Sequence, residues 1–327
     1  MKLAKRMDQI SFSGIRKVFE RVGQLEAAGK KIIHMEIGRP DFTTPANVVN
    51  ACQSALDDGQ VHYTSNYGIP GLRKAIVEKF QKDNRLEYDF RNEIIVTAGA
   101  NEAVFAAIMA LLDPGDEILI PSPCWPTYFS CAHMAGATPI AVKTQSDFQL
   151  DVAPLEKAVT PKTRMLVVNT PHNPTGTVYT RQTLEAVAEF VKAHNLYLIS
   201  DEIYEKIIYD GNEHISMASF PGLRERTITI NGFSKVYAKT GWRLAYIGAH
   251  KELCDGMIRI HQNTIACATS FAQWGGEEAL NGPQDEVQKM VEQFSARRDL
   301  VVTGLNAIPG ISALNPGGAF YAFMDVS

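Results

Sequence analysis

The sequence has few cysteines, and none of them is arranged as a disulfide framework or a metal site. Its eight histidines are also scattered and form no H-E-x-x-H cluster. An odd, dispersed set of cysteines is typical of reduced thiols in a cytoplasmic protein, and this pattern gives no support to metal catalysis. The five cysteines, none of them in a C-x-x-C pair, are Cys52, Cys124, Cys131, Cys254 and Cys267.

Basic tails, membrane-spanning runs and nucleotide-binding glycine motifs are lacking too. The formal net charge is −4 and no lysine/arginine run forms a tail, so nucleic acid is not an expected partner. The longest apolar run, Ala103 to Leu112, is too short to span a bilayer, and the N-terminal MKLAKRMDQISF lacks the apolar stretch of a signal peptide. Without G-x-G-x-x-G or G-x-x-x-x-G-K, a nucleotide-binding enzyme is disfavoured. We therefore expect a cytoplasmic protein with no membrane partner.

What the chain has instead is an alternation of strand and helix patterns between residues 93 and 248. Helical patterns such as Glu102–Leu112 and Arg181–His194 fall between most of the strands. The alternation predicts an α/β fold, with a mostly parallel, seven-stranded sheet between helices. The predicted strands are Ile94–Thr97, Glu117–Ile120, Thr138–Val142, Arg164–Asn169, Leu196–Ser200, Thr227–Ile230 and Leu244–Ile247.

The flanks of this region are mainly helical in pattern. A turn at Asn281-Gly282-Pro283 separates the last two predicted helices. The elements predicted in the flanks are helices at Ile15–Ala28, after Thr44-Pro45, at Leu72–Lys82, at Lys251–Leu280 and from Gln284 to about Asn306, and a strand at Gly317–Phe323.

The stretch from Thr227 to Gly248 carries the most specific chemistry. A strand pattern ends at Asn231-Gly232, Lys235 follows in a loop, and Arg243 stands eight residues further on. A primary amine can form a Schiff base, and a loop at a strand end can hold it rigidly. Free lysine titrates near pH 10.4, so only about one molecule in 10³ is neutral at pH 7, and burial beside a cation would raise that fraction. The planar fork of arginine suits a phosphate.

Further motifs follow other predicted strands, at the edge where parallel sheets bind ligands. Gly99-Ala100-Asn101 opens a helix, whose free amides and dipole suit a dianionic phosphate. Trp125 lies in a proline-flanked loop and offers a face for ring stacking. Asn173 begins an N-P-T-G turn, and D-E-I-Y runs from Asp201 to Tyr204.

Together these motifs resemble the class I/II aminotransferases, which are pyridoxal-phosphate (PLP) enzymes of fold type I like aspartate aminotransferase. The likeness covers roughly residues 36 to 250 and is weaker on both flanks. It implies that Lys235 forms an imine, the internal aldimine, with PLP. It also implies that Arg243 and Gly99-Ala100-Asn101 hold the phosphate. Some members place a phosphate-binding serine three residues before the lysine, where this chain has glycine, and Ser234 is expected to compensate.

The resemblance also implies how the pyridine ring is held. Trp125 would stack on the ring, and Asn173 would donate to its hydroxyl oxygen O3′. Asp201 would pair with the ring nitrogen and keep it protonated, so that PLP acts as an electron sink. Tyr204 would donate to O3′ as well.

Domain organisation and assembly follow from the same resemblance. Residues 1–44 are expected to form an N-terminal arm and the first piece of a small domain, with Gly38 near the substrate. Residues 45–282 would form the PLP-binding large domain, and 283–327 an incomplete part of the small domain. Tyr63 would reach the phosphate of the neighbouring subunit, which implies a homodimer with shared sites.

The expected function is transfer of an amino group from an amino acid to a 2-oxo acid. The freed amine of Lys235 would move a proton between the substrate Cα and the cofactor. A PLP-dependent carbon–sulfur β-lyase would share the same cofactor residues, and release of pyruvate and ammonia without a keto-acid acceptor would identify it. A PLP sensor domain fused to a regulator is disfavoured, because no helix-turn-helix or basic domain is visible.

The C-terminal end carries one more expectation. Members of the family continue for several tens of residues past the Gly317–Phe323 motif, and that part supplies the arginine that binds the substrate α-carboxylate. No arginine follows Arg298 here. The cofactor residues, between Tyr63 and Arg243, are complete. We therefore expect a chain that binds PLP but transaminates weakly, or else a fragment of an ordinary active enzyme. The preferred amino acid is not indicated.

Overall fold

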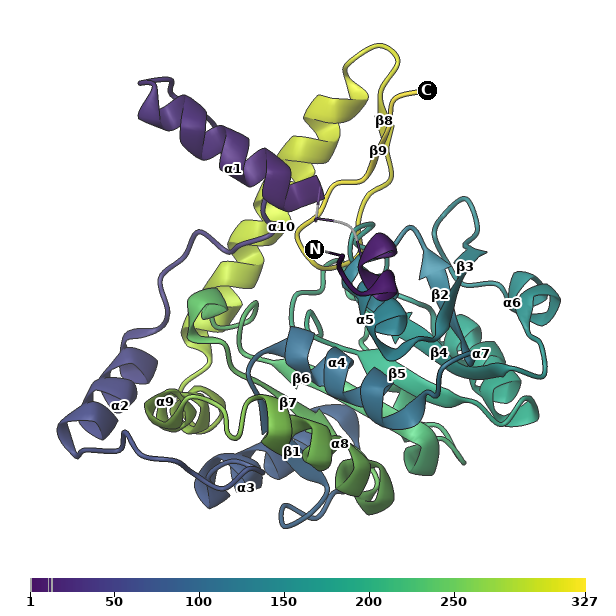
Figure 1. Cartoon of the computed structure of the whole chain (residues 1–327). Coiled ribbons are helices and arrows are strands. Elements are labelled where there is room, and N and C mark those ends of the chain that lie inside the picture. Colours follow the sequence, from purple (N-terminus) through teal and green to yellow (C-terminus); the bar gives the residue numbers. More distant parts are fainter. Residues whose placement is uncertain (1, 11, 13) are drawn as a thin grey trace.

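A seven-stranded sheet runs through the protein between layers of helices, as the computed structural model shows for residues 2–10, 12 and 14–327 (Figure 1). The strand order is β1-β7-β6-β5-β4-β2-β3, and only β7 runs antiparallel to its neighbours. The predicted α/β fold with a mostly parallel sheet is confirmed. The strands are β1 Ile94–Thr97, β2 Glu117–Ser122, β3 Thr138–Lys143, β4 Thr163–Asn169, β5 Tyr197–Asp201, β6 Thr227–Gly232 and β7 Ala245–Gly248.

Successive residues of the central strands pack on opposite faces of the sheet, as the pleat requires. In β5, Leu198 belongs to an apolar cluster with α6 and α7, whereas Ile199 belongs to a cluster with α4, α5 and α8. Both side chains are fully buried. The sheet is therefore covered on both sides, which explains its nearly continuous apolar strands. These helices are α4 Ala100–Leu111, α5 Thr127–Ala135, α6 Val152–Ala158, α7 Arg181–Ala193 and α8 Lys251–Thr264.

A third apolar cluster lies at the β1 edge, where helices from both flanks of the chain meet. Leu72, Phe80 and Phe233 are completely buried in it. The predicted helix over Leu72–Lys82 is an α-helix only to Lys79 and continues as a π-helix. The elements here are α2 Ala46–Asp57, α3 Pro70–Lys79, the π-helix Phe80–Asn84 and α9 Ser270–Asn281.

The single helix predicted over Lys251–Leu280 is wrong, because the structure has two helices there. The chain leaves α8 at Thr264 and turns through Ala266, whose φ is +67°, before α9 begins at Ser270. The physical reason is that α8 packs with α4 whereas α9 packs with α2 and α3. One straight helix could not cover both places, and apolar periodicity does not reveal such a change of direction.

The strand predicted at Gly317–Phe323 is also wrong. Ala319 has a φ of +56°, which turns the chain, and only Gly318 forms a bridge, to Ile208. Extended pairing is limited to a short hairpin of β8 Ser312–Ala313 and β9 Met324–Asp325. The segment is fixed by loop hydrogen bonds instead, since the amide of Ala319 donates to Ile207 O at 2.9 Å.

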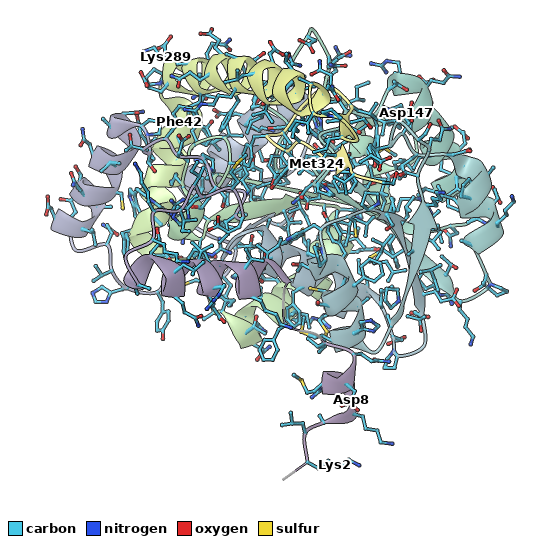
Figure 2. The ribbon with its side chains drawn as sticks, turned by 90° about the horizontal axis from the view of Figure 1, so that it is seen from above. Lys2, Asp8, Phe42, Asp147, Lys289 and Met324 are labelled. Atoms are coloured by element: carbon cyan, nitrogen blue, oxygen red, sulfur yellow. The ribbon has the colours of Figure 1, made fainter. Side chains whose placement is uncertain are left out.

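The two ends of the chain lie outside the sheet layers. A short 3-10 helix at Lys5–Asp8 precedes α1 Gly14–Ala27, and Figure 2 shows Lys2 and Asp8 projecting away from the body. At the other end α10, Asp285–Asn306, leads to the C-terminal hairpin (Figure 1). No helix among the described residues is long and apolar enough to cross a membrane. The division at residues 44 and 282 into domains stays a prediction.

One lysine is buried where its charge has no partner. Lys239 is 0% exposed, and its Nζ has no hydrogen-bond partner among the residues described by the structure. The ammonium lies 4.3 Å from the ring centroid of Trp242 and 5.2 Å from that of Phe233. Burial lowers the pKa of Lys239 to about 7, which the nearby Cys52 only partly opposes.

We expect Lys239→Met to stabilise the protein at neutral pH. The unfolded chain binds the lysine proton up to its ordinary pKa of 10.5, whereas the folded chain releases it from about pH 7. The free energy of unfolding of the parent therefore rises between these pH values, and the variant gains most at pH 7, on the order of 3 kcal/mol. Urea unfolding at several pH values measures the difference. Lys162→Met, at an exposed site, is the control, and an equal effect in both variants would contradict the prediction.

Candidate active site

A cavity of about 1040 Å³ opens beyond the carboxyl ends of β4, β5 and β6. Its position follows from the parallel strands, whose ends bring successive loops to one edge of the sheet. The structure thus gathers most of the residues that the sequence singled out. Those lining the cavity are Gly38, Ala100, Asn101, Trp125, Asn173, Asp201, Tyr204, Ser234, Lys235 and Arg243.

Lys235 enters this cavity from the loop after β6. Its Nζ donates a hydrogen bond to Gly38 O at 2.6 Å and lies 5.7 Å from the ring centroid of Tyr204. Burial lowers the pKa of Lys235 to about 8, although the Asp201 carboxylate opposes the shift. About one molecule in ten therefore carries a neutral, nucleophilic amine at pH 7.

Asp201 ends β5 at the floor of the cavity. It is 3% exposed, and burial raises the pKa of its carboxyl to about 6. Two donors oppose that shift, the hydroxyl of Tyr128 at 2.6 Å from Oδ2 and the amide of Ile203 at 3.3 Å from Oδ1. Tyr128 was not among the site residues predicted from the sequence. The sequence did offer a signal for Tyr128, because it lies three residues after Trp125 at the start of a helix.

An anion cradle is formed where β1 gives way to α4. Gly99 has a φ of +88°, and a Cβ there would lie 2.5 Å from Nη2 of Arg243. Only glycine therefore lets the arginine approach the first turn of α4, which begins at Ala100. The guanidinium and the free amides of that helix end suit a dianionic phosphate.

Tyr321 is a second residue that the sequence missed. Its hydroxyl lies 2.5 Å from the hydroxyl of Tyr204, and a Cβ at Gly38 would lie 2.5 Å from the same oxygen. Burial raises the pKa of Tyr204 well above its ordinary value, so the phenol stays protonated at neutral pH. The glycine-rich motif that begins at Gly317 was predicted to be a strand. The structure has a turn at Ala319 instead, and Tyr321 after this turn lines the cavity.

The remaining predicted residues differ in their placement. Trp125 packs edge to face on Tyr128, with ring centroids 5.3 Å apart. The amide of Asn173 donates to Asn169 Oδ1 at 2.8 Å, which fixes the N-P-T-G turn at the end of β4. Tyr63 is 91% exposed and is not part of the described lining of the cavity.

Comparison with known proteins identifies the family. Residues 30–327 match the family model described as aminotransferase class I and II. The chain belongs to this family. An aspartate aminotransferase of Rhizobium meliloti is 42% identical over 324 residues, which are 98% of this chain and 79% of that protein. An aromatic-amino-acid aminotransferase of Thermococcus litoralis is 40% identical over 99% of this chain and 83% of that protein.

Solved aminotransferase structures have the same fold. The aspartate aminotransferase of Rhizobium meliloti superposes with a TM-score of 0.95 at 40% identity, covering 99% of this chain and 82% of that one. The aspartate aminotransferase of Thermus thermophilus with maleate gives 0.93 at 38% identity, over 99% and 85%. The protein is a PLP-dependent aminotransferase, as predicted.

The cavity of this aminotransferase fits PLP chemically. A lysine with a lowered pKa suits an aldehyde, and a buried carboxylate suits a pyridine nitrogen. A Cβ at Gly99 would meet the guanidinium of Arg243, which lines the same cavity as Ala100 and Asn101 at the helix end, and this donor set suits a phosphate. The residues present therefore match the aldehyde, the pyridine nitrogen and the phosphate of the cofactor.

We expect Tyr128→Phe to weaken PLP binding on the acid side of neutrality. Loss of the 2.6 Å hydrogen bond raises the pKa of Asp201 further above about 6, so less carboxylate is ionised at pH 7. The pH at which PLP affinity falls by half should move up by about one unit. Tyr179→Phe is the matched control, because the buried Tyr179 hydroxyl has no hydrogen-bond partner in the described part of the chain. Coincident pH curves for Tyr128→Phe and the parent would contradict this role.

Proposed function

We propose that Lys235 is the lysine to which this aminotransferase attaches PLP. The observation that carries the proposal is the position of its amine, which enters one cavity together with Asp201, Asn173 and Arg243. Asp201 would hold a proton at the pyridine nitrogen, and Asn173 and Tyr204 would donate to the ring hydroxyl. Trp125 would stack on the ring.

The phosphate would be bound on the other side of the cavity. Arg243 and Ser234 face it from the loop after β6, and the amides of Ala100 and Asn101 face it from the start of α4. This arrangement separates a cationic phosphate site from the anionic carboxylate of Asp201. The cofactor could then bind in one orientation only.

The chain's residues would act on the substrate as follows. Bound PLP supplies an electron sink for charge that develops on the substrate Cα. Lys235 would take up the proton from the substrate Cα and release it again, and its pKa of about 8 suits proton transfer in both directions near neutral pH. The hydroxyls of Tyr204 and Tyr321 form a hydrogen bond that fixes both rings at the cavity wall.

We propose that acidic amino acids are the preferred donors. The support is the number of similar proteins named aspartate aminotransferase, together with a cationic side chain, Arg297, on the cavity wall. Arg297 donates to Asp41 at 2.7 Å, and both side chains are partly exposed. Turnover of aspartate and glutamate with 2-oxoglutarate or oxaloacetate as acceptor should exceed that of tyrosine and phenylalanine at least tenfold. A higher kcat/KM for aromatic donors, the class named for the Thermococcus litoralis relative, would contradict this proposal.

We expect borohydride reduction of the PLP-loaded enzyme to label Lys235 alone. The reduced bond is stable, so peptide mapping by mass spectrometry locates it. Lys239 is an internal control, because its amine is buried behind the loop, against Trp242. Lys235→Ala should lose the label and the transaminase activity. A label on another lysine of the parent would refute the assignment.

We propose a homodimer whose subunits share their active sites. The support is Tyr63, which is 91% exposed and away from the cavity of its own chain although its sequence motif implies phosphate binding. Exposed apolar side chains of α1, among them Val18 and Phe19, would suit a subunit contact.

A mixture of two inactive variants tests this assembly. Lys235→Ala and Tyr63→Ala homodimers should both be impaired. After unfolding and refolding together, the hybrid dimer would combine one intact Lys235 with one intact Tyr63 in a single site. Activity should therefore return to about a quarter of the parent value, the share of parent-like sites in a random mixture. If Tyr63 acts within its own chain, no activity should return in the mixture, and this result would contradict the proposal of shared sites.

We place the enzyme in the cytoplasm. The support is that all five cysteines are free thiols, three of them buried, which suits a reducing compartment.

A further inference from the structure

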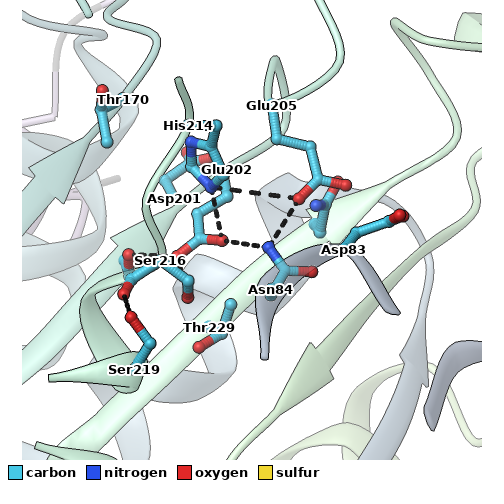
Figure 3. Close-up of polar contacts among 12 residues, drawn as sticks. Asp83, Asn84, Thr170, Asp201, Glu202, Glu205, His214, Ser216, Ser219 and Thr229 are labelled. Atoms are coloured by element: carbon cyan, nitrogen blue, oxygen red, sulfur yellow. Dashed lines mark hydrogen bonds and ion pairs between the residues drawn. The ribbon is translucent and has the colours of Figure 1, made fainter. Parts of the chain in front are cut away.

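The segment that follows β5 faces two ways. Asp201 and Tyr204 line the active-site cavity. The residues next to them, Glu202 and Glu205, point behind it into a buried polar network (Figure 3). Residues 203–206 are a turn with no strand neighbours to hold them, so something else must fix the two side chains that enter the cavity.

Glu202 is the centre of that network. Its side chain is 0% exposed, and each carboxylate oxygen accepts two hydrogen bonds. A carboxylate has about four acceptor positions, and these are filled by four donors that come from three separate places in the sequence. The donors are Ser200 Oγ at 2.7 Å and Ser216 Oγ at 2.7 Å on Oε1, and Asn84 Nδ2 at 3.3 Å and His214 Nε2 at 2.9 Å on Oε2.

The donors tie the turn to distant elements. Asn84 is the last residue of the π-helix, and its amide also donates to Glu205 at 2.9 Å. The amide of Glu202 itself donates to Ile230 O in β6 at 2.8 Å. The turn is thus held to β6, to the π-helix and to the segment around Ser216 by groups outside the cavity.

A metal does not explain this cluster, although Glu202, Glu205 and His214 offer ligand atoms close together. The ammonium of Lys79 forms an ion pair with Glu205 and donates to Asn84 Oδ1 at 2.7 Å. Burial would raise the pKa of Glu205, but Lys79, His214 and the hydrogen bond from Asn84 together outweigh burial and lower it to about 2. The amide of Asn84 donates to both carboxylates, and a lysine ammonium pairs with Glu205, so the protein itself supplies the partners of this cluster.

We propose that Glu202 is a positioning residue for the aminotransferase reaction, whose four-donor clamp keeps Asp201 and Tyr204 in place from behind the cavity. Misplacement of a reacting group by about 1 Å can cost about 100-fold in rate, so a rigid support outside the site matters to catalysis. The inference rests on the proposed roles of Asp201 and Tyr204.

Glu202 also acts on the site through its charge. Its anion adds to burial in raising the pKa of Asp201, and would favour a protonated pyridine ring in the same way. The titratable groups near Glu202 are Asp201 and Glu205 on its own segment, His214, and the phenols Tyr88 and Tyr246. Lys79 on α3 pairs with Glu205.

Two substitutions separate the clamp from the charge. Glu202→Gln keeps hydrogen bonds, because the Ser200 and Ser216 hydroxyls can accept from the new amide. Glu202→Ala removes the clamp. We expect kcat per PLP-loaded site to fall a few-fold for Gln and about 100-fold for Ala, with the KM for the amino donor changed less than threefold. The pH midpoint of the cofactor's visible absorption should fall by about half to one unit in Glu202→Gln.

A readout without cofactor or activity is hydrogen exchange of the peptide covering residues 201–206. Exchange there should be at least tenfold faster in Glu202→Ala than in the parent. Glu93→Ala is the matched control, since Glu93 is another buried carboxylate, bonded to Arg224 at 2.7 Å and remote from the cavity. It should lower Tm without changing kcat per loaded site or exchange at 201–206.

The outcomes are distinct. A lower Tm with unchanged kcat, absorption midpoint and local exchange in the Glu202 variants would make the residue merely structural and overturn the proposal. If Glu202→Ala does not fold, Ser216→Ala takes its place. It should lose kcat a few-fold, and an unchanged kcat would count against the clamp.

Asp201→Asn belongs in the same series. Full activity there would refute the proposed function, whereas its loss beside unaffected Glu202 variants would refute this inference alone.

Discussion

The burial of one carboxylate at the end of a parallel strand determines how the rest of this site is built. Asp201 is 3% exposed, and a charge in that position must be compensated. Tyr128 donates a hydrogen bond to the carboxylate, and the charge of Lys235 lowers its pKa. The turn that follows Asp201 is fixed by the hydrogen bonds of Glu202. The elements that supply these groups are far apart in the sequence, so the site exists only when the sheet has formed.

Much of the architecture could be predicted because its signals are local. Alternating strand and helix patterns gave the sheet, and β1 was predicted to the residue, at Ile94–Thr97. The cavity residues after β1, β5 and β6 were predictable for a related reason, since strand ends of a parallel sheet meet at one edge. Lys235, Asp201 and Asn173 were singled out by the likeness of their motifs to the aminotransferase family, and their positions at strand ends agree with that likeness.

The failures concern features that depend on contacts across the chain. The bend at Ala266 arises because α8 and α9 pack against different partners, and the turn at Ala319 is fixed by the amide bond to Ile207. Tyr128 and Tyr321 were missed because their importance lies in a single hydroxyl contact each. The role proposed for Tyr63 came from the family likeness, because a residue that acts in a neighbouring subunit has no partner within its own chain to reveal it.

The contact between Lys235 and Gly38 has a consequence for how the amine is presented to a carbonyl. An N–H of Lys235 donates to Gly38 O at 2.6 Å, and Gly38 itself lies against Tyr321. Because this hydrogen bond uses an N–H and leaves the lone pair of the neutral amine free, the amine stays nucleophilic while its position is fixed. The backbone at Gly38 therefore limits the directions from which a carbonyl can approach the lysine.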